Sequence, residues 1–115
     1  MTLLRNALFA AALALPATSA MAEIDILSVT FTCENGVPLP VTYFNAPDGS
    51  GAAATLVDNT LVAMRQVESG SGIRYESTGD EGTYILRSKG WNASISSLAA
   101  GAANEQTIYQ DCSSR

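Results

Sequence analysis

The chemistry open to this sequence is limited by its lack of histidine. The chain has eleven acidic and six basic side chains but no histidine, which excludes Ser-His-Asp and Cys-His catalysis. Ser71 and Lys89 could form a Ser-Lys pair, but catalysis would need a desolvated, neutral lysine, and a lysine in a Lys-Gly corner is expected to be exposed. Two carboxylates could act in glycoside hydrolysis, but most, such as Asp48, Asp58 and Asp80, fall in turn-like or outward positions. The sequence therefore predicts a protein that is not an enzyme.

Residues 1–22 have the features of a secretory signal peptide. Arg5 supplies a positively charged start, Asn6–Leu15 is mostly apolar, and the segment after Pro16 ends in an A-x-A cleavage pattern. The apolar stretch is too short and too rich in alanine to indicate a membrane span.

We expect cleavage after Ala22, with Ala20 as the alternative, so the mature domain comprises residues 23–115. A lipoprotein would need cysteine as its first mature residue, and neither cysteine stands there. The sequence therefore predicts a protein that is free in the periplasm or secreted, without a membrane anchor.

The mature domain is strongly acidic. Removal of Arg5 leaves five basic and eleven acidic side chains, a formal net charge of −6. Nucleic acid is an unfavourable partner because its phosphates would be repelled, whereas a strongly basic protein would be attracted. The acidity also fits a simpler role in keeping a secreted domain soluble.

Two cysteines, Cys33 and Cys112, lie near the two ends of the mature domain. An even number of cysteines behind a signal peptide indicates a disulfide, which for so long a loop would contribute roughly 4 kcal/mol in the chain-entropy model. Zinc binding is disfavoured because two thiolates without histidine offer too few ligands. No P-loop, dinucleotide fingerprint or zinc motif is present, so we expect neither a cofactor nor a metal.

Short β-like segments alternate with turn signals throughout the mature domain. Leu27, Val29, Phe31 and Cys33 alternate with polar residues, which predicts a strand with one buried face. The segment 56–67 fits neither the helical nor the strand period cleanly. Further strands are expected at 41–45, 52–57, 60–67, 73–76, 83–88, 91–96 and 106–111, with Asp58-Asn59 as a two-residue hairpin turn.

About eight short strands in a domain of this length favour one fold class. They predict an all-β protein, a small eight-stranded antiparallel barrel whose interior is filled by side chains. A two-sheet sandwich is the alternative. The sequence shows no internal repeat and no second domain.

Several short motifs follow one another in a recognisable order. An aromatic-x-C-x-x-G pattern begins at Phe31 and is followed by V-x-Y-x-N at residues 41–45, S-G-x-x-Y at residues 71–75 and a K-G corner at residues 89–90. With the final Cys112, this order resembles the periplasmic and membrane-bound inhibitors of C-type lysozyme from Gram-negative bacteria. The resemblance covers nearly all of the chain between the first and last of these motifs.

Three departures from the family pattern are visible. The loop between Tyr75 and Tyr84 is a few residues longer than usual. Leu86-Arg87 replaces the aromatic residue that commonly precedes the K-G corner, and Trp91 follows the corner instead; phenylalanine also stands in the first motif where tyrosine is frequent. The longer loop bears on affinity and on the choice of lysozyme more than on the fold.

The resemblance implies an eight-stranded barrel with one disulfide between the first and last cysteines. It also implies that the loop carrying Ser71 and the corner carrying Lys89 enter the substrate cleft of a C-type lysozyme and block it. We expect Gly72 to have a conformational role, Arg74 to lie at the rim of the interface, and Tyr75 to pack inward in phase with Ile73.

Two other functions are also compatible with the sequence. A periplasmic barrel could be structural or could carry a small ligand without inhibiting lysozyme, since eight-stranded barrels sometimes hold one ligand. The Ser71–Lys89 pair could belong to a hydrolase. No oligomeric state is predicted.

Overall fold

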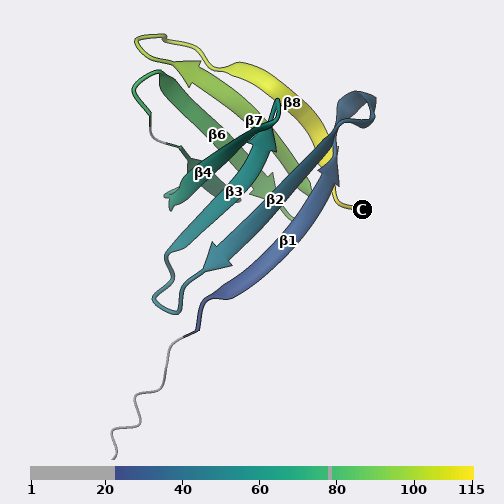
Figure 1. Ribbon diagram of the computed structural model, residues 1–115, viewed down its shortest axis with the longest axis vertical. Helices are drawn as coiled ribbons and strands as arrows, with labels where there is room; N and C mark the ends of the chain where they lie inside the picture. The colour runs from purple at the N-terminus through teal and green to yellow at the C-terminus, as the bar shows by residue number, and fades with distance from the viewer. Residues whose placement is uncertain (1–22, 78) are drawn as a thin grey trace, which may run out of the picture.

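The chain folds into a closed antiparallel barrel of eight strands, each paired with its neighbours in sequence (Figure 1). The computed structural model describes residues 23–77 and 79–115; the expected signal peptide, residues 1–22, lies outside them. Within the described ranges, no helix has the length and apolar character needed to cross a membrane. The barrel confirms the predicted fold and excludes the two-sheet sandwich. The strands are β1 (Asp25–Thr32), β2 (Pro38–Asn45), β3 (Gly51–Val57), β4 (Thr60–Val67), β5 (Ile73–Glu76), β6 (Gly82–Lys89), β7 (Asn92–Ala99) and β8 (Gln106–Ser113), and a 3-10 turn, η1 (Glu34–Gly36), joins β1 to β2.

The inward side chains of the strands fill the barrel. In β2, Leu39, Val41 and Tyr43 are buried and alternate with partly exposed residues, as a strand with one buried face requires. Buried and exposed residues alternate in the same way in β3 and over most of β4. The buried side chains form one continuous core, so side chains occupy the interior as predicted. The largest members of the core include Phe31, Leu39, Val41, Tyr43, Val57, Val62, Met64, Tyr75, Leu86 and Ile95.

The ambiguous segment 56–67 comprises the end of β3, a turn and the whole of β4. Asp58 and Asn59 both have positive φ angles, 49° and 63°, the backbone of a type I′ turn that suits the twist of paired strands. β3 and β4 pair from Val57–Thr60 next to this turn to Ala52–Arg65.

The predicted burial of β1 is wrong over its first half. Leu27 is 57% exposed, although Phe31 is only 3% exposed. β1 pairs with β2 along its whole length, but its pairing with β8 is limited to Thr32 and Ser113. Among the described residues, the start of β1 therefore has a strand neighbour on one side only, which leaves Leu27 exposed.

A disulfide lies at the place where the first and last strands meet. Cys33, directly after β1, is bonded to Cys112 in β8, which confirms the predicted pair. Both cysteines are buried, and the adjacent Thr32–Ser113 pair joins the two strands. The end of β8 lies beside the end of β1 in Figure 1.

A salt bridge fastens the segment before β8 to the outer face of β6 and β7. Arg87 donates from Nη1 and Nη2 to Oε1 and Oε2 of Glu105 at 2.8 and 2.9 Å, and Ser96 Oγ donates to Oε1 at 2.6 Å. The bonds from Arg87, and to a smaller extent the bond from Ser96, lower the pKa of Glu105 to about 2. Ser96, which donates to this carboxylate, is itself buried.

Removal of the disulfide should destabilise the barrel strongly. The bond spans 79 residues, so the double variant Cys33→Ala/Cys112→Ala should lose roughly 4 kcal/mol of unfolding free energy in the chain-entropy model. Urea unfolding followed by far-ultraviolet circular dichroism measures this loss. An unchanged midpoint in the double variant would show that the bond adds no stability.

The Arg87–Glu105 pair should make stability depend on pH in acid. The folded-state pKa of about 2 for Glu105 lies below the value of about 4.3 for a free glutamate. The stabilisation is therefore fully present above about pH 5 and lost as the pH falls toward 2. Both side chains are over a third exposed, so solvent screening limits the contribution to on the order of 1 kcal/mol or less.

Thermal unfolding of the wild type and of Glu105→Gln at several pH values tests this pair. The wild type should be the more stable protein at pH 6, and the difference should shrink as the pH falls toward 2. A difference that stays constant over this range would contradict the assignment.

Candidate functional site

The structure brings Ser71 and Lys89 together at one end of the barrel. β5 and β6 pair with Ile73 opposite Ser88, so the loop before β5 lies beside the end of β6. Lys89 Nζ donates a hydrogen bond to Ser71 Oγ at 3.0 Å. Both residues are exposed, and the hydroxyl and the ammonium form one small polar surface.

Ser69 holds the backbone of the loop that presents Ser71. Its Oγ donates to the Ser71 carbonyl at 2.8 Å and accepts from the Ser71 amide at 3.3 Å. Ser69 was not among the site residues predicted from the sequence. A serine in a loop commonly forms such a turn, because its hydroxyl can bond to the backbone two residues further on.

Gly72 is required where the loop passes close to β6. Its φ angle is +67°, and a Cβ atom built there would lie 2.6 Å from the Ser88 carbonyl oxygen and 3.2 Å from Lys89 Cβ. Glycine adopts this conformation without a steric penalty and leaves room for the neighbouring backbone. The conformational interpretation of Gly72 agrees with this geometry.

Tyr75 packs inside the barrel and is not part of the exposed surface. It is 2% exposed, and its ring centroid lies 5.5 Å from that of Tyr43. Burial raises the pKa of Tyr75, and the neighbouring Tyr43 raises it further. Ile73, expected to be buried in the same phase, is 44% exposed because it lies at the end of β5, at the rim of the barrel.

Arg74 lies on the outer face of the barrel. Its guanidinium Nη2 is 2.7 Å from Oε2 of Glu76, and both side chains are about a third exposed. Across the strand pair it faces Arg87, whose charge is met by Glu105. Arg74 and Arg87 each form a salt bridge with a carboxylate. Lys89, in contrast, donates its hydrogen bond to a neutral hydroxyl.

The geometry gives no support to a Ser-Lys hydrolase. A catalytic lysine must be desolvated to lose its charge, and Lys89 is exposed. Among the residues that the structure describes, no group of three or more potential metal ligands occurs. The site can offer hydrogen bonds and a positive charge to a partner.

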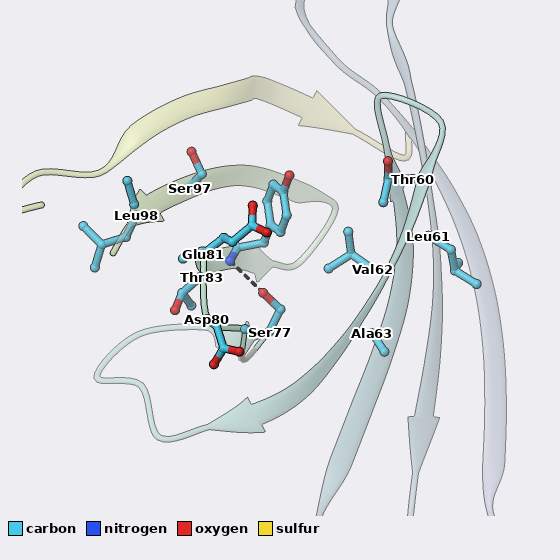
Figure 2. Close-up of a pocket in the computed structure, with 14 residues that line it drawn as sticks. Thr60, Leu61, Val62, Ala63, Ser77, Asp80, Glu81, Thr83, Ser97 and Leu98 are labelled. Carbon is cyan, nitrogen blue, oxygen red and sulfur yellow. Dashed lines mark hydrogen bonds between the residues drawn. The ribbon is translucent and has the colours of Figure 1, made fainter. Parts of the chain in front are cut away.

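A cavity of about 740 Å³ lies at the other ends of β6 and β7. Val62 points into it from β4, while Leu61 points away (Figure 2). Ser77 and Tyr84 also line it, and the Tyr84 amide donates to Ser77 Oγ at 2.7 Å. Asp80 and Glu81 supply the charged side chains of its lining. The cavity does not include Ser71 or Lys89.

Sequence comparison identifies relatives of this chain. Residues 31–104 match the model of a family described as membrane-bound lysozyme-inhibitor of c-type lysozyme. A membrane-bound lysozyme inhibitor of C-type lysozyme from Pseudomonas aeruginosa is 37% identical over 74 residues, which cover 64% of this chain and 55% of the relative. One from Cupriavidus necator is 35% identical over 66 residues, 51% of this chain and 52% of the relative. The chain thus spans about half the length of the curated relatives it matches.

Two solved structures have a similar fold. A periplasmic lysozyme inhibitor of C-type lysozyme from Salmonella typhimurium has a TM-score of 0.64 and 26% identity, over 81% of this chain and 99% of that chain. Pseudomonas aeruginosa MliC, solved in complex with hen egg white lysozyme, has a TM-score of 0.54 and 28% identity, over 89% of this chain and 100% of that chain.

Gly72→Ala should disturb the loop that presents Ser71. Because residue 72 has a left-handed backbone and lies close to the Ser88 carbonyl, the substitution should lower the free energy of unfolding by on the order of 1–3 kcal/mol. Gly70→Ala is the matched control, because a Cβ atom there has no neighbour within 4 Å. Thermal unfolding and amide NMR shifts compare the two variants, and equal stability would contradict the proposed role of Gly72.

Proposed function

Because this chain belongs to the family of membrane-bound lysozyme inhibitors of C-type lysozyme, we propose that it binds a C-type lysozyme and occludes the active-site cleft. The loop carrying Ser71 and the corner carrying Lys89 are the parts that enter the cleft. The hydrogen bond of 3.0 Å between these two exposed side chains carries the proposal, because it places a cation and a hydroxyl side by side at one end of the closed barrel.

The chemistry of the cleft matches what this end offers. C-type lysozyme uses two carboxyl groups, an acid in an apolar pocket and an ionised partner. Lys89 has three N–H donors, and its bond to a carboxylate would be charge-assisted. Ser71 can both donate and accept. Lys89 is also the single lysine of the chain, so no other ammonium side chain can substitute for it.

The remaining charges favour a basic partner. Residues 23–115 carry a formal net charge of −6, from five basic and eleven acidic side chains. This net negative charge would attract a basic lysozyme over a distance and raise the association rate. The attraction should weaken as salt screens it.

The function proposed here is binding without turnover. The family is named for inhibition, and the Ser71–Lys89 pair is exposed to solvent. Export by residues 1–22 would place the protein where it meets a lysozyme. The curated relatives are named membrane-bound and one solved relative is named periplasmic, so the absence of a lipid anchor stays a prediction.

Ser71→Ala and Lys89→Ala should each weaken inhibition while the barrel stays folded. Each removes a hydrogen-bonding group from the proposed interface and should cost roughly 1–3 kcal/mol of binding, where about 1.4 kcal/mol is tenfold in affinity. The measurement is the dose dependence with which purified, oxidised protein prevents a C-type lysozyme from lysing bacterial cell walls.

Arg65→Ala is the matched control for charge. Arg65 is exposed on β4, so its removal changes the net charge by the same amount as Lys89→Ala. Arg65→Ala should inhibit almost as well as the wild type. Undiminished inhibition by Lys89→Ala would overturn the proposed mechanism, and no inhibition by the wild type would overturn the proposed function.

A further inference from the structure

Trp91 lies at the tip of the hairpin that presents Lys89. Lys89 and Asn92 form the last pair between β6 and β7, so Gly90 and Trp91 are the two residues of the turn. Gly90 has a φ angle of +61°, as the first position of a II′ hairpin turn requires. The tight turn therefore places Trp91 close to Lys89, only two residues away in the chain.

The indole is exposed but held in place. Trp91 is 55% exposed, and the guanidinium carbon of Arg115 lies 4.4 Å from its ring centroid. The Ser114 amide donates to the Trp91 carbonyl at 2.9 Å. Ser113, one residue earlier, pairs with both Asn92 and Thr32, so the segment that stacks on the indole is itself anchored to the barrel.

We propose that Trp91, stacked on Arg115, is a second anchor that contacts C-type lysozyme beside the point where Lys89 enters the cleft. This inference rests on the proposed function. Tryptophan and arginine are the residue types most enriched among the side chains that dominate binding energy. An indole that is already ordered loses little freedom on binding.

The partner offers matching chemistry. The acid carboxyl of a C-type lysozyme lies in an apolar pocket, so apolar surface is present close to the group that Lys89 would approach. Lys89 supplies charge and donors to the carboxylates, and the indole face supplies apolar area. The guanidinium of Arg115 adds a second positive charge at the same end of the barrel.

The position of Trp91 separates it from most of the other exposed apolar side chains. Large exposed hydrophobic residues occur at the start of β1, around the β3–β4 hairpin and next to the Ser71–Lys89 surface. Those next to this surface are Ile73 and Trp91, and the others are Ile24, Ile26, Leu27, Leu56 and Leu61.

Fluorine NMR can test the contact directly. The chain contains a single tryptophan, so biosynthetic labelling with 5-fluorotryptophan gives one protein signal. Unlabelled hen egg white lysozyme is silent in this experiment. Addition of one equivalent should shift or broaden the signal, because the partner surface replaces water around the indole.

Affinity measurements on variants complete the test. By isothermal titration, Trp91→Ala should bind lysozyme about tenfold more weakly, Trp91→Phe should lose less, and Arg115→Ala should show a smaller loss. Leu61→Ala, which removes an apolar side chain that is 71% exposed on β4, is the control and should bind like the wild type. Lys89→Ala should flatten the salt dependence of binding, whereas Trp91→Ala should preserve it.

The outcomes separate the inference from the function on which it rests. If the wild type binds lysozyme, but the fluorine signal does not change and Trp91→Ala binds as tightly as Leu61→Ala, Trp91 is not an anchor and the proposed function stands. If the wild type does not bind at all, both proposals fail.

Discussion

The bond between Cys33 and Cys112 is the constraint on which the rest of the structure depends. β1 and β8 share one register pair, Thr32 with Ser113, within the described chain, whereas the other neighbouring strands are joined by three or more pairs. A barrel avoids exposed strand edges only while its first and last strands stay together. The disulfide lies directly beside this weak seam and replaces the missing ladder of hydrogen bonds with a covalent bond.

The same bond supports the end of the barrel where we place the binding surface. Cys112 pairs with Ala93 near the start of β7, and the hairpin that carries Lys89 leads into that strand. Cys112, Lys89 and Ser71 also line one small hollow. Binding to lysozyme should therefore require the oxidised protein, and a periplasmic or extracellular setting would supply the oxidising conditions.

The sequence predicted what depends on local pattern. A period of two in apolar residues identified the strands, and Asp58-Asn59 identified a hairpin, because side-chain direction and turn geometry are set by neighbouring residues. The exposure of Leu27 was missed because it depends on which strand lies beside β1. The family resemblance implied that Ser71 and Lys89 act at one interface, but their hydrogen bond depends on the register of β5 on β6 and was not predicted. The link from Arg87 to Glu105 is equally non-local.

Competition with a fragment of the substrate tests the central claim most directly. Binding of the oxidised protein to hen egg white lysozyme is measured by isothermal titration in the presence of increasing concentrations of a chito-oligosaccharide that occupies the sugar cleft. If the loop of Ser71 and the corner of Lys89 fill that cleft, the apparent Kd rises in proportion to the sugar concentration once the sugar exceeds its own Kd. An apparent Kd that does not change when the sugar saturates the cleft would show that the protein binds elsewhere on lysozyme.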